Sequence, residues 1–288
     1  MIVVRLCGGL GNQLFQYAAG RRLAQVRRSE LVLDLGWYRH TPAFNTPRAY
    51  ELARYPIQAR PAQGSERFWC ALHQGRILRR LPLPRRWRHV RERGYDFDAR
   101  ILDLPDGVYL DGYWQSHRYF VDIADTLRRE LEPVEAMGDA DREVAAHMQD
   151  VPNAVCLHVR RGDYVSNPQA ARFHGVCGLD YYERAVGYLM ERLHQPHFFV
   201  FSDDMPWVRA QLRIAAPVRY VDHNGPQAAF QDLRLMSRCR HHVVANSSFS
   251  WWAAWLAAQP AQQVIAPRAW FADGRATPDL IPPEWVRL

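Results

Sequence analysis

The sequence predicts an α/β protein whose strands form parallel, doubly wound sheets. Two observations carry this prediction. The first 35 residues read as strand, glycine loop, helix and strand, which is the start of a βαβ unit. From residue 154 to 256, apolar strand candidates alternate with helical patterns, and such alternation is typical of a parallel sheet. With 288 residues the chain can form two modest domains or one large one.

The N-terminal unit contains a glycine loop. A short apolar strand, Ile2–Leu6, leads into Gly8–Gln13, and apolar residues at helical spacing then precede a second strand at Leu31–Leu35. The loop is neither a Walker A motif nor GxGxxG, but its glycines let the backbone approach a ligand closely. Asn12 and Gln13 stand where the helix begins, so they could cap it or contact a sugar.

Residues 76–93 (RILRRLPLPRRWRHVRER) are dense in arginine. One interpretation is an amphipathic patch that lies on anionic lipid. The other, which we favour because charge runs are usually solvated, is a pair of solvated helices interrupted by Pro82 and Pro84. Nucleic-acid binding is less favoured, because the chain has no recognisable module for it.

A strand candidate at 108–110 leads into Gly-Tyr-Trp-Gln-Ser at 112–116. Trp114 and Gln115 offer an aromatic face and an amide, which suit a sugar, but Trp114 equally fits a core residue beside a turn. Residues 119–131 then predict a helix, and the acidic, turn-rich stretch 133–141 predicts a linker. We therefore place one domain at 1–140 and a second at 141–266. The proline- and tryptophan-rich tail, 267–288, is expected to pack back on the body.

The strand at 154–159 ends in Arg160-Arg161-Gly162-Asp163. In open α/β sheets, ligands bind just beyond the carboxyl ends of strands. A pair of arginines at such a place suits a diphosphate, because the guanidinium makes bidentate contacts and is always charged.

The other strands of this half also end in polar residues. The predicted strands 197–201, 218–221 and 241–245 are followed by Ser202-Asp203-Asp204, Asp222-His223-Asn224 and Asn246-Ser247-Ser248. The last set precedes a tryptophan-rich helix, so its free N–H groups could bind an anion, or Asn and Ser could simply cap the helix. Asp203 and Asp204 could accept hydrogen bonds from a ribose or base, or cap the helix that Pro206 begins.

Composition limits the class of protein and of partner. The net charge is +7 with a pI near 9.4, and every basic residue other than histidine is arginine. This balance fits a nucleic acid, an anionic membrane or a phosphorylated substrate, or only a GC-rich genome. There is no apolar run of about 18 residues and no signal-peptide pattern. Five cysteines in no paired spacing favour reduced thiols in a cytosolic protein.

Metal binding is not expected. Asp96-Phe97-Asp98 spells D-x-D, a pattern of metal-dependent glycosyltransferases, but it lies outside the clear α/β half. His241 and His242 are adjacent on a strand, so their rings point to opposite faces. No zinc spacing is present. Arginines are available to neutralise a diphosphate without a metal ion.

Five blocks together resemble the bacterial α-1,2-fucosyltransferases of glycosyltransferase family 11. They are GGLGNQLFQYA at 8–18, GYWQS at 112–116, HVRRGDY at 158–164, FSDD at 201–204 and NSSFSWWAAWL at 246–256. The resemblance implies a GT-B-like fold with two facing Rossmann-type domains and a donor cleft between them. It implies an acceptor-side N-terminal domain, a C-terminal domain that binds GDP-fucose, inversion at the fucose carbon, and neither metal nor other cofactor.

The resemblance also assigns roles residue by residue. Arg160 is expected on the GDP phosphates, and Asp163 is a candidate base that could instead orient Arg160 or His158. Asn12 is expected to face the sugar and acceptor, and it forms the expected catalytic set together with Arg160 and Asp163. The full expected donor set is His158, Arg160, Ser202, Asp203, Asp204, Asn246, Ser247, Ser248 and Phe249, and the acceptor set is Asn12, Gln13, Trp114 and Gln115.

Three functions stay open at this point. The first is an α-1,2-fucosyltransferase that acts on a terminal β-galactose of a surface glycan such as O-antigen, including a lipid-linked one. The second is a GT-B enzyme with another nucleotide sugar or fucose linkage. The third is a non-enzymatic basic protein that binds membrane or nucleic acid, but polar groups converging at four strand ends argue against it. We expect a cytoplasmic protein, with peripheral binding to the inner membrane as a hypothesis and no nucleic-acid partner.

Overall fold

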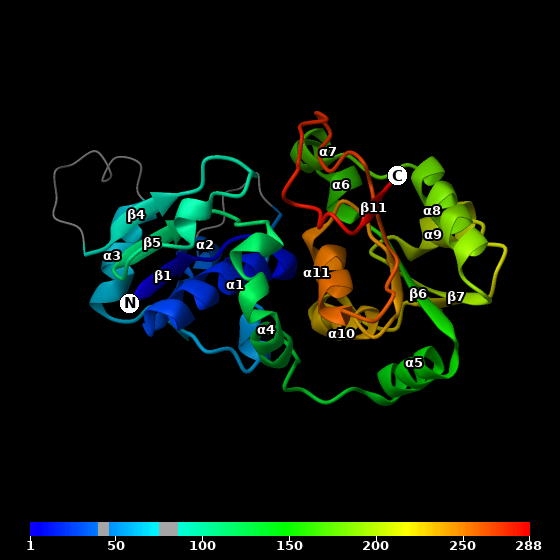
Figure 1. Ribbon diagram of the computed structural model, residues 1–288, viewed down its shortest axis with the longest axis horizontal. Coiled ribbons are helices and arrows are strands. Elements are labelled where there is room, and N and C mark those ends of the chain that lie inside the picture. Colours follow the sequence, from blue (N-terminus) through cyan, green and yellow to red (C-terminus); the bar gives the residue numbers. More distant parts are fainter. Residues whose placement is uncertain (40–45, 75–85) are drawn as a thin grey trace. The chain divides into compact units, whose positions relative to one another are not determined.

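The computed structural model describes residues 1–39, 46–74 and 86–288, and the chain divides into two units (Figure 1). Unit 1 comprises Met1–Glu132 and Pro278–Pro282, and unit 2 comprises Pro133–Thr277 and Pro283–Leu288. The change of unit thus comes at the start of the stretch predicted as a linker. The predicted tail, 267–288, is divided between the two units, because Pro278–Pro282 belong to unit 1 and the rest belongs to unit 2.

Unit 1 contains a parallel five-stranded sheet in the order β3-β2-β1-β5-β4. Its strands are β1 (Ile2–Arg5), β2 (Leu31–Asp34), β3 (Arg60–Pro61), β4 (Arg88–Arg91) and β5 (Val108–Asp111). Its α-helices are α1 (Leu10–Arg27), α2 (Gly36–Arg39), α3 (Ser65–Gln74) and α4 (Ala124–Glu130). The apolar side chains of β1 are completely buried at the centre of this sheet. This position follows from their sequence, since a strand covered on both faces needs a continuous apolar run.

Helix α1 lies close against the sheet because of one glycine. A Cβ on Gly20 would lie 2.3 Å from Cγ2 of Val4 and 3.0 Å from Cδ1 of Leu31. Any side chain at this position would therefore push the helix away from β1 and β2. The close packing positions α1 on the sheet. It thereby also positions the glycine loop, which connects the carboxyl end of β1 to this helix.

The arginine-rich segment differs from the favoured prediction. Its described part, residues 86–93, contains strand β4 rather than a helix, and residues 76–85 lie outside the described residues. Trp87 is only 3% exposed and packs in a core cluster with Val3, Val32 and Tyr109. The helix predicted at 119–131 is also broken, into the short 3₁₀ helices His117–Tyr119 and Val121–Ile123 followed by α4.

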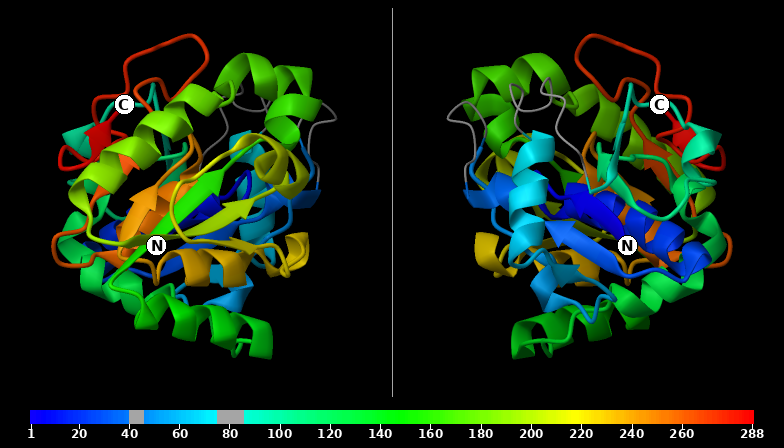
Figure 2. Two further views of the ribbon diagram at one scale, coloured as in Figure 1. Left: turned by 90° about the vertical axis from the view of Figure 1, so that its right-hand side faces the viewer. Right: turned by 90° about the vertical axis from the view of Figure 1, so that its left-hand side faces the viewer.

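Unit 2 contains a parallel six-stranded sheet in the order β11-β10-β9-β6-β7-β8. Its strands are β6 (Asn153–Val159), β7 (Pro196–Ser202), β8 (Val218–Val221), β9 (His241–Val243), β10 (Val264–Ala266) and β11 (Val286–Arg287). Counted along the chain this is the order 3-2-1-4-5-6 of the dinucleotide-binding fold. The strand order reverses between β6 and β9, so this is where a ligand is expected. The neighbouring arrows of β6 and β7 run in the same direction (Figure 2).

The α-helices of unit 2 are α5 (Asp139–Asp150), α6 (Gly162–Ser166), α7 (Pro168–His174), α8 (Leu179–Arg192), α9 (Met205–Gln211), α10 (Ala229–Met236) and α11 (Ser248–Ala257). Of these, α5, α6 and α7 were not predicted, nor were strands β10 and β11. The tail therefore contributes a short strand to the sheet. The prediction of two Rossmann-type α/β domains, as a GT-B-like fold requires, is confirmed, while the cleft between them stays a prediction.

Two further predictions concern the whole chain. In the parts of the chain that the structure describes, none of the helices has the length and apolar character needed to cross a membrane. All five cysteines are free and buried, so none forms a disulfide bond.

Candidate functional site

Arg160 follows β6 directly and is held by two carboxylates. Its Nη1 lies 2.9 Å from Oδ2 of Asp203, and its Nη2 donates to Oδ1 of Asp163. All three side chains are partly exposed, at 20%, 27% and 16% for Arg160, Asp203 and Asp163. Burial opposes the charged form, but Asp203 and Asp163 outweigh it and raise the pKa of Arg160. The guanidinium is therefore a fixed, oriented positive charge at the end of the strand.

Arg161 is bound to the β7 end as well. Its N–H donates to Oδ1 of Asp203 at 2.8 Å, its Nε donates to Oδ2 of Asp204 at 3.0 Å, and its guanidinium carbon lies 3.9 Å from the ring centroid of Trp207. Asp204 also caps α9 by accepting from the Trp207 N–H at 3.2 Å, and Ser202 accepts from the Asp204 N–H at 2.9 Å. The Ser-Asp-Asp set thus organises the arginine pair, and its contact with a ribose or base stays a prediction.

Gly162 leaves room for the Asp203 carboxylate beside the turn between the arginines and Asp163. A Cβ at this position would lie 2.4 Å from Oδ2 of Asp203, the oxygen that pairs with Arg160. Such a distance is far below a normal van der Waals contact. The structure thus gives a steric reason for the glycine in this motif.

Asn246, just after β9, is hydrogen-bonded to the last residue of α7 and to the C-terminal segment. Its Nδ2 donates to the carbonyls of His174 at 2.8 Å and Trp270 at 3.3 Å, while its Oδ1 accepts from Sγ of Cys177 at 3.4 Å. The side chain is only 3% exposed. Asn246 is therefore a buried support residue that connects the chain after β9 with two neighbouring segments.

The N-terminus of α11 lies next along the chain. Oγ of Ser247 accepts from the Phe249 N–H at 3.3 Å, which is the predicted capping bond. Ser248 and Phe249 are partly exposed. The hydroxyl and N–H groups of this first turn combine with the positive end of the helix dipole to favour a bound anion.

The two strongest sequence blocks touch each other at the switch point of the sheet. The rings of His158 and Phe249 lie 5.8 Å apart, and the Tyr164 hydroxyl donates to the Asn246 carbonyl at 3.4 Å. Burial lowers the pKa of His158 to about 4, so this imidazole is neutral at pH 7. Arg160 and the N–H groups at the start of α11 are therefore the hydrogen-bond donors that this part of unit 2 offers to an anionic ligand.

In unit 1 the two segments predicted to bind an acceptor are also joined. Nε2 of Gln115 donates to Oδ1 of Asn12 at 2.8 Å. Gln13, in contrast, is completely buried: its Nε2 donates to the carbonyl of Ala49 at 2.8 Å and its Oε1 accepts from the Glu51 N–H at 2.9 Å. Gln13 thus supports the loop, and this placement does not offer it to a ligand.

The two aromatic residues of Gly-Tyr-Trp-Gln-Ser differ in their exposure to solvent. Trp114 is 1% exposed and makes an edge contact with Tyr119, with ring centroids 5.8 Å apart. Trp114 is therefore a core residue beside a turn, which was the second of its two interpretations. Because its ring is buried, a sugar does not reach it in this structure. Tyr113, which the sequence analysis did not single out, is 36% exposed.

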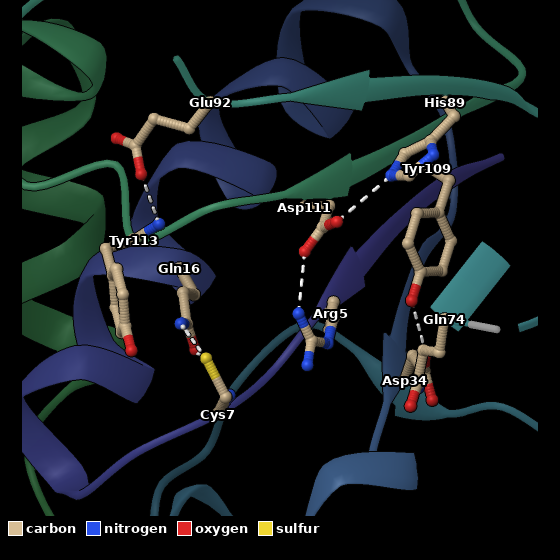
Figure 3. A network of polar contacts seen from close by, with 10 residues as sticks. All are labelled: Arg5, Cys7, Gln16, Asp34, Gln74, His89, Glu92, Tyr109, Asp111 and Tyr113. Carbon is tan, nitrogen blue, oxygen red and sulfur yellow. Dashed lines mark hydrogen bonds and ion pairs between the residues drawn. The ribbon is translucent and has the colours of Figure 1, made fainter. Parts of the chain in front are cut away.

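A polar network at the carboxyl ends of β1 and β5 was missed (Figure 3). Asp111 accepts from Nη1 of Arg5 at 2.8 Å, and its other oxygen lies 3.1 Å from Nε2 of His89. Burial opposes ionisation, but His89 and Arg5 hold the pKa of Asp111 well below its ordinary value. Both Arg5 and Asp111 end strands of one sheet, so the strand-end rule applied to the first half would have found them.

The metal candidates have other partners. Asp98 accepts from Nε of Arg100 at 2.8 Å and caps a 3₁₀ helix. His241 bonds with Asn153 and His242 with Met236, as expected for rings on opposite faces. Among the described residues, no group of three or more His, Cys, Asp or Glu side chains is placed to hold a metal ion.

Comparison with known proteins identifies the relatives of this chain. The sequence pattern of Glycosyl transferase family 11 matches residues 85–288. The alpha-1,2-colitosyltransferase of Escherichia coli is 34% identical over 100% of this chain and 99% of its own length. The O-antigen biosynthesis glycosyltransferase WbnK of the same species is 30% identical over 98% and 99%. The galactoside alpha-(1,2)-fucosyltransferase 1 of Pan troglodytes is 26% identical over 87% of this chain and 63% of its own length.

Proposed function

This chain belongs to glycosyltransferase family 11, and from that membership we propose that it transfers L-fucose from GDP-fucose to O2 of a terminal β-galactose, with inversion at the fucose anomeric carbon. The α-1,2 linkage is supported by the names of both a bacterial and a mammalian relative. A surface glycan such as O-antigen is the proposed acceptor, because WbnK is named for O-antigen biosynthesis.

The observation that carries the donor proposal is that Arg160 follows β6 and the N-terminus of α11 follows β9, and these two strands are neighbours at the switch point of the unit 2 sheet. The diphosphate of GDP-fucose would lie there, between the guanidinium and the Ser247–Phe249 turn. Asp163 and Asp203 each occupy one terminal nitrogen of Arg160. A guanidinium has five N–H donors, and we propose that donors not used by these two carboxylates bind the phosphate oxygens.

The chemistry follows from the leaving group. As the bond from the fucose carbon to the β-phosphate breaks, negative charge grows on that phosphate. Arg160 and the α11 N–H groups are already oriented, so they stabilise this charge without a further rearrangement. We propose that this stabilisation needs neither a metal ion nor another cofactor.

The acceptor hydroxyl must also lose its proton. We propose that Asp163 acts mainly by orienting Arg160, because its Oδ1 accepts from that guanidinium. A base must be within hydrogen-bond reach of the proton it removes. The Asp163→Asn variant separates the two roles: an orienting residue affects donor affinity, whereas a base affects only turnover.

A second donor is favoured by one specific observation. The relative with 34% identity is named as a colitosyltransferase, and colitose is L-fucose without its 3-hydroxyl group. The diphosphate site proposed above would bind both GDP-sugars alike. A competition between GDP-fucose and GDP-colitose, with product formation from each donor measured separately, decides between them.

The proposed function is tested by GDP release from GDP-fucose with and without lactose or Galβ1-3GalNAc, in EDTA. We expect acceptor-dependent release and a product that α-1,2-fucosidase cleaves. A product that resists this enzyme would contradict the linkage. Activity that appears only after Mg²⁺ or Mn²⁺ is added would contradict metal independence. No release and no GDP binding would overturn the donor assignment.

Peripheral binding at the cytoplasmic face of the inner membrane is proposed separately, from the arginine-rich segment. Of this segment the structure describes Arg86 and residues after it, and Trp87 is buried in the core rather than free to insert into lipid. Sedimentation with anionic liposomes tests the proposal. Binding that is unchanged when the arginines of residues 76–80 are replaced by glutamine would contradict it.

A further inference from the structure

One exposed aromatic ring lies beside the residues that join the two acceptor segments. We propose that Tyr113 is the platform on which the acceptor sugar stacks, and that Glu92 is the positioning residue that holds it. The proposal rests on the proposed function, because it assumes that unit 1 receives a sugar acceptor.

The exposure of the two neighbouring aromatics selects Tyr113. It is 36% exposed, whereas Trp114 is 1% exposed and belongs to the core. An aromatic face packs against the C–H face of a sugar ring, and an aromatic with a polar tip suits a surface that is apolar on one side and wet on the other. The chain continues directly into Gln115, whose amide meets Asn12 at 2.8 Å. Tyr113 also interacts with Cys7, directly before the glycine loop that contains Asn12, so the ring and the two amides belong to adjoining segments, and their mixture is typical of a ligand site.

Glu92 fixes the turn that carries this ring (Figure 3). Its Oε2 accepts from the Tyr113 N–H at 2.6 Å, and its Oε1 accepts from the Trp114 N–H at 2.9 Å. Two consecutive backbone donors are therefore bound by one carboxylate from the end of the neighbouring strand β4. Such a pair of contacts fixes both the position and the direction of the turn.

The turn needs this support because its backbone is unusual. Trp114 has a φ of +57°, in the left-handed region that non-glycine residues adopt only at a cost. Gly112 lets the turn come close: a Cβ there would lie 2.4 Å from Cβ of Glu92. With Trp114 anchored in the core and the Glu92 carboxylate bound to the turn, the Tyr113 hydroxyl lies against the thiol of Cys7, while part of the Tyr113 side chain stays exposed to solvent (Figure 3).

The first experiment measures the acceptor KM for lactose in Tyr113→Ala and Tyr113→Phe. Loss of the ring should raise KM roughly 5- to 10-fold, and the phenylalanine variant should stay near wild type because it keeps the ring. Phe68→Ala is the matched control, since Phe68 is an exposed aromatic of unit 1 on α3, at 61% exposure. An unchanged KM in Tyr113→Ala, or an equal rise in the Phe68 control, would overturn the stacking role.

The second experiment examines Glu92→Gln, whose amide keeps one acceptor oxygen in place of two. Hydrogen exchange at the amides of Tyr113 and Trp114 should become faster, while exchange in α1 stays unchanged. Acceptor KM should rise, and kcat at saturating acceptor should stay within about twofold, because binding geometry and not the reacting groups is altered. Unchanged exchange at both amides, or a fall in kcat without a rise in KM, would overturn the positioning role.

Failure of this inference can be separated from failure of the proposed function. Binding of methyl β-galactoside, observed by saturation-transfer NMR, does not require turnover. If wild type binds the galactoside but transfers nothing, the proposed function fails, and loss of binding in Tyr113→Ala still supports the platform. If wild type binds no galactoside, the platform is overturned, whatever GDP release from the donor alone shows.

Discussion

Nη1 of Arg160 and Oδ2 of Asp203 lie 2.9 Å apart although the two residues are 43 positions apart in the chain. The register of β6 and β7 brings them together, because Val159 is paired with Ser202. Each residue directly follows its strand, so the ion pair connects two adjacent strand ends. The pair orients Arg160 before any substrate binds, and this preorganisation is the basis of the first prediction.

Replacing Arg160 by lysine should lower kcat roughly 100- to 1000-fold, because one oriented donor to the leaving group is lost. Lysine keeps the charge beside Asp163 and Asp203, so the fold should survive, but it cannot make a bidentate contact with phosphate. Turnover and thermal unfolding are measured together. Arg184→Lys is the control, since Arg184 makes an exposed pair with Asp180 at 2.7 Å on α8. Retained turnover in Arg160→Lys would contradict the phosphate role.

The end of a strand could be predicted from the sequence where the strand is a continuous run of apolar residues. Residues 154–159 are continuous in apolar character apart from His158, so β6 and the position of Arg160 followed from the sequence. Strand β4, by contrast, reads Arg-His-Val-Arg and carries no apolar signal. It is a strand because it pairs with β5 and because Trp87 is buried just before it. Glu92 was missed for this reason, since no strand end was expected at its position.

A glycine variant tests the Arg160–Asp203 pair without removing either charge. In Gly162→Ala the new methyl group would displace Oδ2 of Asp203, which it would approach to 2.4 Å. Arg160 would then lose one of its two carboxylates, and turnover should fall roughly tenfold or more through misplacement of the guanidinium. Steady-state kinetics with GDP-fucose provide the measurement.

Gly187→Ala is the matched control for this variant. Gly187 lies inside α8, and a Cβ there meets no atom within 4 Å. Alanine should raise the free energy of unfolding by about 0.5–1 kcal/mol through its better helix propensity, with turnover unchanged. Equal turnover in the two variants would show that Asp203 does not position Arg160.

The Asn12–Gln115 hydrogen bond predicts a coupling between the two acceptor segments. Asn12→Ala, Gln115→Ala and the double variant form a cycle in which acceptor KM is measured. If both side chains act as one unit, the effects should be non-additive by about 1 kcal/mol, the usual worth of such a bond. Strictly additive effects would show that each amide contacts the acceptor independently.

The acceptor residues of unit 1 were harder to predict than the donor residues of unit 2, because the sequence did not show which side chains are buried. Gly-Tyr-Trp-Gln-Ser contains two adjacent aromatics, and of these Trp114 was the one predicted to bind the acceptor. The positive φ at Trp114 breaks the alternation of a strand, so no periodicity tells which ring is buried. Gln13 looked like a ligand residue for a similar reason. Its burial depends on the segment at 49–51, which no local pattern connects with the glycine loop.

The stability of the wild type relative to Glu92→Gln should depend on pH. Burial raises the pKa of Glu92 from 4.5 to about 7. The negative charge of Asp111 adds to this rise, whereas the hydrogen bonds from the Tyr113 and Trp114 N–H groups oppose it. A raised pKa means that the folded protein binds the proton more tightly than the unfolded chain. The free energy of unfolding should therefore increase, relative to Glu92→Gln, as the pH falls from 8 to about 4.5. The gain should be on the order of 2 kcal/mol, reduced from the full linkage value because the carboxylate is partly exposed.

Acceptor binding should change in the opposite direction over the same range. The ionised Glu92 carboxylate accepts two N–H groups, whereas its protonated form keeps one good acceptor oxygen, so the Tyr113 turn loosens as the pH falls below 7. Asp111 on β5 and Tyr119 are the titratable groups whose charges interact with Glu92. Because the pKa of Asp111 is held low and that of Tyr119 is raised to about 12, neither titrates between pH 6 and 8. Acceptor KM should thus rise from pH 8 to pH 6 in wild type and stay flat in Glu92→Gln. Parallel profiles in the two proteins would place the titrating group elsewhere.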